Sequence, residues 1–163
     1  GRTELDFNGQ GTGYALFIQN GSFPQIVTRN GLPRDLIHVP LSESHTVFNH
    51  EGKGWVKGNC LRGLGSHYWY NLSPNTPCDR IFPVFLLYNR HALIGFGFLI
   101  PLNLKEYHKA SFKQQFLEHI NYATLIVLMQ KYTVPKCLYY DTRYYNWTTV
   151  YVYFISNPED IKC

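Results

Sequence analysis

Two apolar segments, residues 82–88 and 92–100, dominate the hydrophobic pattern of the chain. Each is rich in aromatic or branched side chains and is close to the usual length of a strand. Polar residues 89–91 separate them, so the pattern predicts a β-hairpin; a membrane span would bury Arg90 at mid-bilayer at a high cost. Near-continuous apolarity predicts strands covered on both faces. Gly95 and Gly97 share one face of the second strand and leave room for a large ring or another chain segment.

Shorter patterns predict further strands on both sides of this hairpin. Residues 14–18 and 23–28 flank the turn signal Asn20-Gly21, which tolerates positive φ and predicts a second hairpin. A short apolar piece follows at 36–39, and we also expect a hairpin formed by 44–48 and 55–56 and a late strand at 148–155. The glycines in residues 58–70 predict an irregular segment, and the polar, glycine-rich residues 1–13 predict a loose N-terminal arm.

The apolar spacing changes after residue 110 and predicts one long helix over about residues 111–132. Ser111 with Gln114 matches a capping box, and Pro135 ends the segment. Leu125 and Ile126 fall outside the main apolar face. That face is formed by residues at spacings of four, four, three and four: Phe112, Phe116, Ile120, Ala123 and Val127.

Together these elements predict an α+β fold: an antiparallel β-sheet built from hairpins, with the helix at about 111–132 packed on it. The 163 residues suit one domain and show no internal repeat or linker, so we predict a single domain over residues 1–163. The composition agrees with a packed core, because 45% of the residues are hydrophobic and 16% are charged. The formal charge of +4 comes without a run of Lys or Arg, which argues against a nucleic-acid partner.

Cysteines and glycosylation signals predict the secretory route. The chain has four cysteines, none of them in a C-x-x-C pair, and three Asn-x-Ser/Thr signals at Asn20, Asn71 and Asn146. We therefore expect a secreted glycoprotein with two disulfides; Pro74 after the Asn71 signal disfavours modification there. Sequence alone allows three pairings. The pairing of nearest neighbours is favoured, Cys60 with Cys78 and Cys137 with Cys163, and free reactive thiols are the competing hypothesis.

Candidate chemistry is sparse. His67 lies in a loop of glycines and rings and is a candidate general base, because its ordinary pKa lies near neutrality. The competing interpretation is a structural histidine among rings, since local spacing fixes no partner carboxylate. No nucleophile elbow, P-loop, dinucleotide fingerprint or H-E-x-x-H motif is present. We predict no cofactor and no metal site.

The abundance of aromatic residues, 17% of the chain, suggests recognition. We expect a non-enzymatic secreted module that binds an extracellular protein, a glycan or an apolar small molecule through an aromatic-rich surface or cavity. The alternative hypothesis is a small secreted hydrolase with a His67-centred site. A tyrosine-rich tail that includes Tyr139, Tyr140, Tyr151 and Tyr153 also suggests a recognition surface. The predicted ligand-binding residues are Tyr68, Trp69, Tyr70, Tyr144, Tyr145 and Trp147.

Overall fold

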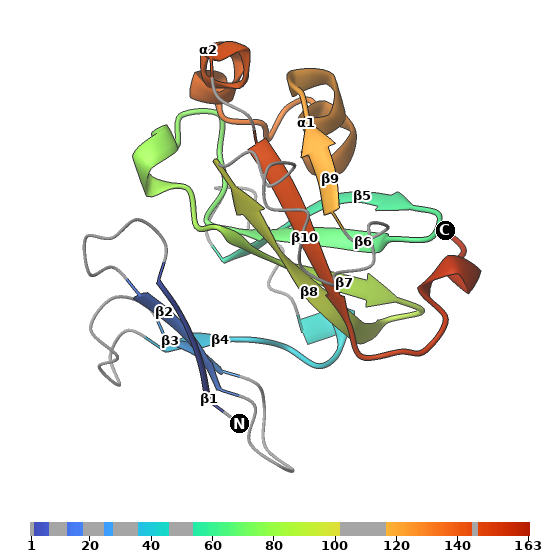
Figure 1. Cartoon of the computed structure of the whole chain (residues 1–163). Helices are drawn as coiled ribbons and strands as arrows, with labels where there is room; N and C mark the ends of the chain where they lie inside the picture. Colours follow the sequence, from blue (N-terminus) through green and yellow to red (C-terminus); the bar gives the residue numbers. More distant parts are fainter. Residues whose placement is uncertain are drawn as a thin grey trace, which may run out of the picture. The chain divides into compact units, whose positions relative to one another are not determined.

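The computed structural model describes residues 2–6, 13–17, 25–27, 36–45, 54–101, 117–144 and 147–163. The chain divides into two compact units, residues 1–45 and residues 46–163, which are described separately (Figure 1). That the whole chain forms one domain stays a prediction. The predicted Asn20-Gly21 turn lies outside the described residues, as do the capping-box residues Ser111 and Gln114.

The first unit is a four-stranded antiparallel sheet in the order β1-β2-β3-β4. Its strands β2 and β3 confirm the two predicted at 14–18 and 23–28, and β4 lies in the short apolar piece at 36–39. Residues 2–6 form a strand instead of a loose arm, because the backbone of β2 supplies their hydrogen-bond partners. Their polar sequence did not predict this pairing. The strands are β1 (Arg2–Asp6), β2 (Gly13–Phe17), β3 (Gln25–Val27) and β4 (Leu36–His38), followed by the 3-10 turn η3 (Glu43–His45).

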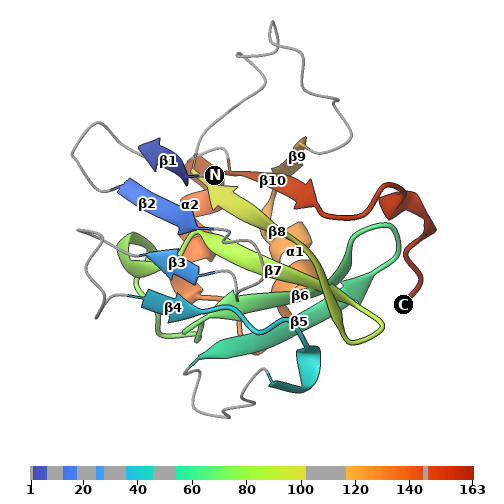
Figure 2. The same ribbon diagram turned by 90° about the horizontal axis from the view of Figure 1, so that it is seen from below.

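The second unit contains a six-stranded antiparallel sheet in the order β5-β6-β7-β8-β10-β9 (Figure 2). The first four strands form a meander, after which β10 pairs with β8 and β9 pairs with β10. The fold class is therefore α+β with an antiparallel sheet, as predicted. Its strands are β5 (Trp55–Leu61), β6 (Gly65–Tyr70), β7 (Val84–Asn89), β8 (Ala92–Ile100), β9 (Leu117–Ile120) and β10 (Trp147–Tyr153).

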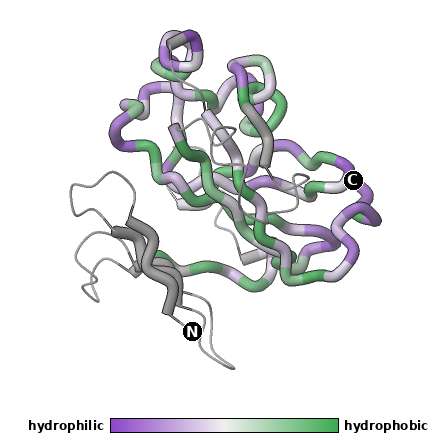
Figure 3. The backbone as a smooth tube through the Cα atoms, in the orientation of Figure 1, coloured by the Kyte–Doolittle hydropathy of each residue, from purple (hydrophilic) through white to green (hydrophobic). Residues whose placement is uncertain are grey.

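The central hairpin confirms the strongest sequence prediction. Strands β7 and β8 pair through a two-residue turn in which Arg90 and His91 have φ of 48° and 66°, the sign that a type I′ turn requires. Side chains are buried at successive positions of both strands, as the apolar runs predicted. The ring of Phe85 on β7 lies over Gly97 on β8, where a Cβ would overlap it. The room predicted at Gly97 is therefore filled from within the protein. Hydrophobic colours follow these strands in Figure 3.

The segment at 58–70 is more regular than predicted. It forms the β5–β6 hairpin, whose turn places Gly63 and Gly65 at φ of 78° and 96°. The glycines thus serve the turn, while the irregularity is limited to a register shift between Lys57 and Cys60. The hairpin predicted for 44–48 with 55–56 lies partly outside the described residues, because 46–48 fall outside them; Ser44 lies in η3, and β5 pairs with β6.

The prediction of one long helix at 111–132 is wrong within the described residues. Residues 117–120 form β9, because pairing with β10 satisfies their backbone and overrides the helical spacing. Asn121 then caps a short helix, α1 (Tyr122–Met129), by accepting a hydrogen bond from the Thr124 backbone N–H at 2.9 Å. A second helix, α2 (Lys136–Tyr144), begins directly after Pro135, which had been expected only to end a helix.

The helical face that is buried also differs from the predicted one. Leu125, Leu128 and Met129 of α1 are fully buried, whereas Ala123 is exposed and Val127 is 47% exposed. The reason is tertiary packing: α1 lies against β5 and β6, and this contact decides which of its sides is buried. Leu125, which fell outside the predicted face, is therefore part of the core.

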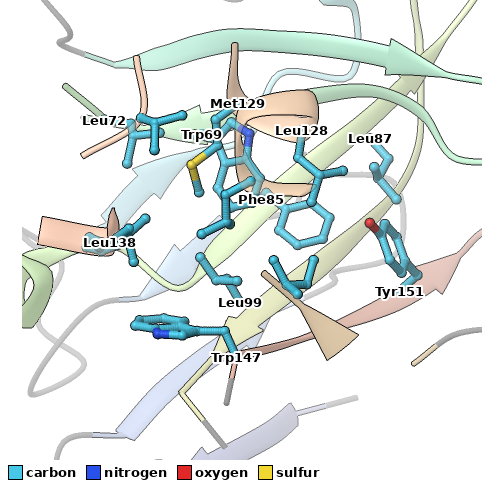
Figure 4. Packing of buried hydrophobic residues seen from close by; sticks show 14 of the residues in the cluster. Trp69, Leu72, Phe85, Leu87, Leu99, Leu128, Met129, Leu138, Trp147 and Tyr151 are labelled. Atoms are coloured by element: carbon cyan, nitrogen blue, oxygen red, sulfur yellow. The ribbon is translucent and has the colours of Figure 1, made fainter. Parts of the chain in front are cut away.

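Both helices cover the same face of the six-stranded sheet, as Figures 1 and 2 show together. Side chains from the sheet and from α1 and α2 converge there into one core (Figure 4). Odd-numbered positions of β6, β7 and β10 supply this face, as strand alternation requires. The core cluster includes the large rings of Trp69, Phe85, Trp147 and Tyr151. In the described residues, no helix has the length and apolarity needed to cross a membrane.

All four cysteines are in disulfides, but the favoured pairing is wrong. The bonds join Cys60 to Cys163 and Cys78 to Cys137. The C-terminal segment returns to the β5–β6 turn, where the Gly63 backbone N–H donates to the Ile161 carbonyl at 3.0 Å. Tertiary contacts thus bring together cysteines that are 103 and 59 residues apart in sequence. In the chain-entropy model, loops of these lengths correspond to roughly 4 to 5 kcal/mol of stabilisation each.

Candidate functional site

His67, the candidate general base, lies at the centre of β6 and points into the core. Its Nδ1–H donates to the Asn59 carbonyl at 3.2 Å, and its Nε2 faces the Tyr151 hydroxyl at 3.4 Å. Three rings surround it: Phe85 at 5.4 Å, Tyr151 at 5.9 Å and Trp69 at 6.4 Å between centroids. The side chain has no exposed surface. Both nitrogens of His67 therefore have partners within the protein, and its ring is enclosed by other rings.

Burial determines the charge of His67. It lowers the pKa from 6.5 to about 4, and hydrogen bonds with the backbone of Asn59 and Gly65 oppose this only in part. The imidazole is neutral at physiological pH and has no path to a substrate proton, which a general base must reach within hydrogen-bond distance. The geometry is that of a structural histidine, and the hydrolase hypothesis gains no support from it.

Several of the predicted ligand-binding rings are part of the core. Tyr68, Trp69 and Trp147 are buried, and their neighbours are other parts of the protein. Tyr70 is half-buried and packs edge-on against Trp55, at 5.1 Å between centroids, and Phe82, at 5.5 Å. Tyr144 is the last residue of α2, and Tyr145 lies outside the described residues. A ligand-binding role for these residues stays a prediction. Tyr68, Trp69 and Trp147 have almost no exposed surface.

Three tyrosine rings and a cation gather around α2, and we call this set the α2 tyrosine surface: Tyr122, Tyr139, Tyr140 and Arg143. Tyr122 is half-buried, and the other three residues are exposed. Tyr139 meets the rings of Tyr122 and Tyr140 edge-on, each at 5.1 Å between centroids. The Arg143 guanidinium lies over the Tyr139 ring, 4.3 Å from its centroid, and donates to the Tyr139 hydroxyl. Tyr139 is 39% exposed and Tyr140 is 65% exposed. The surface thus combines accessible rings with a cation.

The orientation of α2 follows from what its other side contacts. Leu138 is fully buried, Cys137 is bonded to Cys78, and Asp141 accepts a hydrogen bond from the buried Trp147 indole at 3.0 Å. These three contacts turn positions 137, 138 and 141 inward. Positions 139, 140 and 143 consequently face outward. Trp147, predicted to bind a ligand, instead holds the helix that displays the exposed rings.

Half of this surface was predicted from the sequence. Tyr139 and Tyr140 were in the tyrosine-rich tail, whereas Tyr122 and Arg143 were missed. The i, i+4 spacing of Tyr139 and Arg143 is a detectable signal once a helix is expected, because residues at that spacing are neighbours on its surface. The other tail tyrosines differ: Tyr151 and Tyr153 share one face of β10, as predicted, and their rings are stacked at 6.2 Å between centroids within the fold.

In the described part of the chain, no group of three or more His, Cys, Asp or Glu side chains is arranged to hold a metal ion. Comparison with known proteins yields no relative: the chain matches no protein-family model, no curated protein and no solved structure. Inferences about function therefore rest on the geometry of this molecule.

Proposed function

We propose that this chain is a secreted, disulfide-stapled recognition module that binds an extracellular protein through the α2 tyrosine surface. The observation that carries the proposal is the display of Tyr139, Tyr140 and Arg143 on a helix anchored from behind. Tyr and Arg are enriched among the residues that dominate binding energy at protein interfaces. The rings also hold one another in place, which lowers the conformational entropy that binding would cost.

Charge favours a partner with an acidic surface. Residues 130–144 contain three basic residues and one acidic residue, and Lys131, Lys136 and Arg143 are all exposed. The acidic residue, Asp141, is directed inward by its bond to Trp147. A basic, aromatic surface is complementary to carboxylates, which steer the encounter and pair with guanidinium. A glycan partner is less favoured, because Arg143 already covers one face of the Tyr139 ring.

The test is a binding screen of the full chain, made in a secretory host, against displayed extracellular protein domains and, in parallel, immobilised glycans. Tyr140→Ala and Arg143→Ala are compared with Tyr132→Ala, a matched control that is 82% exposed and lies outside the surface. We expect a protein ligand whose affinity falls by about tenfold or more in the first two variants, falls with rising salt, and is unchanged in the control. Binding that is insensitive to both surface variants, or selective for glycans, would overturn the proposal.

A further inference from the structure

Asn71 is the one of the three glycosylation signals that lies within the described residues, since Asn20 and Asn146 fall outside them. It follows β6 directly, is exposed, and has φ of 50°. Asparagine tolerates this left-handed backbone better than most residues. The turn therefore has a structural reason to carry asparagine, and its side chain is accessible from solvent.

The carboxamide of Asn71 is held in one orientation. Its Oδ1 accepts a hydrogen bond from the Gly54 backbone N–H at 2.6 Å, and its own backbone N–H donates to the Gly54 carbonyl at 2.7 Å. The first bond directs the side-chain oxygen toward Gly54, and the second holds the backbone of the turn beside it. The Nδ2 atom, on the other side of the same carbon, has no hydrogen-bond partner among the described residues. A substituent on Nδ2 would leave the Gly54 bonds intact.

The hydroxyl of the signal is engaged in the folded turn. Ser73 Oγ lies 3.1 Å from Thr76 Oγ1, and the Ser73 backbone N–H donates to the same oxygen at 2.9 Å. The turn is also fastened to α2 by the Cys78–Cys137 bond and by the Lys136 backbone N–H, which donates to the Pro74 carbonyl at 3.0 Å. Glycosylation requires an enzyme to contact both Asn71 and Ser73 in an extended chain. The folded turn does not have that conformation.

We infer that Asn71 carries an N-linked glycan on Nδ2, and that the glycan is added before this turn closes. The inference rests on the secretory route in the proposed function. The sugar comes from an oligosaccharide activated as a lipid-linked diphosphate. The anomeric carbon–oxygen bond to that phosphate breaks, the bond from the anomeric carbon to Nδ2 forms, and one Nδ2 proton leaves. Pro74 and closure of the turn both compete with the transfer, so partial occupancy is expected.

The first experiment is peptide mass spectrometry of the full chain from a secretory host, before and after glycan removal. We expect glycan mass on part of the Asn71 peptide in the parent and none in Ser73→Ala, which removes the signal but keeps the Gly54 bonds of Asn71. Pro74→Ala is expected to raise occupancy. An unmodified Asn71 alongside a glycan on Asn20 or Asn146 would overturn this inference alone. A chain that is retained in the cell without any glycan would overturn the proposed function with it.

The second experiment tests the order of events. Unglycosylated chain is offered to a purified oligosaccharyltransferase with a lipid-linked donor, once folded with both disulfides and once reduced and unfolded. Because the closed turn must open locally before it can react, we expect the folded form to be modified at least about tenfold more slowly. Equal rates for the two forms would show that turn closure does not restrict the transfer.

Discussion

The aromatic residues around His67 and those of the α2 tyrosine surface are chemically alike and structurally opposite. Around His67, Trp69 and Phe85 lie 4.7 Å apart between centroids and are completely enclosed between the sheet and α1. On α2, Tyr139 and Tyr140 lie 5.1 Å apart and remain accessible. Residue type therefore does not separate core from surface in this protein. Strand alternation and the rotation of each helix about its axis decide which aromatic rings are buried.

The polar atoms of the two regions differ as well. In the core, His67 finds the Asn59 carbonyl and the Tyr151 hydroxyl, while Trp69 Nε1 and Thr149 Oγ1 are buried without a hydrogen-bond partner among the described residues. Such groups lose hydration without full compensation. On α2, water can satisfy whatever Arg143 and the tyrosine hydroxyls leave unpaired. We therefore expect the residues around His67 to determine stability and the α2 tyrosine surface to determine binding. Four predictions test this difference.

The largest effect is expected from removing an enclosed ring. Phe85→Ala would leave a cavity between Trp69, His67 and Tyr151, and we expect the free energy of unfolding to fall by about 4 kcal/mol. The matched change on the other region, Tyr140→Ala, should alter it by less than about 0.5 kcal/mol. Urea denaturation of both variants measures the difference. Equal losses would show that the α2 surface is part of the stabilising core.

The next effect concerns pH and also belongs to the core. Because the folded protein lowers the pKa of His67 from 6.5 to about 4, the unfolded chain binds this proton more readily. The contribution of His67 is present above pH 6.5 and is lost progressively as the pH falls toward 4. At about 1.4 kcal/mol per pH unit, the loss over this window is about 3 kcal/mol.

This pH effect is measured by urea denaturation at several pH values in the parent and in His67→Gln, which cannot take up the proton. The variant should lack the part of the pH dependence that falls between 6.5 and 4. The same slope in both proteins would assign it to other groups.

An intermediate effect is expected where the core requires the absence of a side chain. In Gly97→Ala the new Cβ would overlap the Phe85 ring and approach the Val150 carbonyl. We expect the free energy of unfolding to fall by about 2 kcal/mol. In a Phe85→Leu background the overlapping ring atoms are gone, so the same substitution should cost less. Full additivity in this double-mutant cycle would contradict the direct packing of Phe85 on Gly97.

The smallest effect is expected at an exposed turn. Arg90 and His91 both have positive φ at the tip of the β7–β8 hairpin, where Asn and Gly are favoured. The double change Arg90→Asn with His91→Gly should therefore raise the free energy of unfolding by about 1 kcal/mol. Arg62→Asn, at an exposed position of the β5–β6 turn without positive φ, is the control. If the control gives the same gain, relief of backbone strain is not the cause.

Elements whose signal is local were predictable. The β7–β8 hairpin shows in two apolar runs joined by polar residues, and both strands and turn form where expected. The packing of a large ring against Gly97 was also foreseeable, since a residue without a side chain on a buried face leaves space for one. The helix α2 was missed because its nine residues, Lys136–Tyr144, contain few apolar positions and follow a proline.

Elements that depend on distant partners were not predictable. Leu117–Ile120 carries a helical spacing but becomes a strand because β10 lies alongside it. The candidate site shows the same limit: Tyr139 and Tyr140 were named from the sequence and Arg143 was not, and the exposure of all three depends on Leu138 and Asp141 facing inward. A local pattern states which side chains share a face. It does not state which face is covered.

By itself, the sequence determined an α+β fold with an antiparallel sheet, its central hairpin, and a set of cysteines suited to two disulfides. The tertiary structure alone decided that Cys60 bonds to Cys163 and Cys78 to Cys137, that residues 117–120 are a strand, and which rings are buried. The physical reason is the separation along the chain over which each kind of interaction acts. Backbone propensity and periodicity act over a few residues, whereas burial and pairing join segments up to 103 residues apart, and their energies outweigh the local preferences.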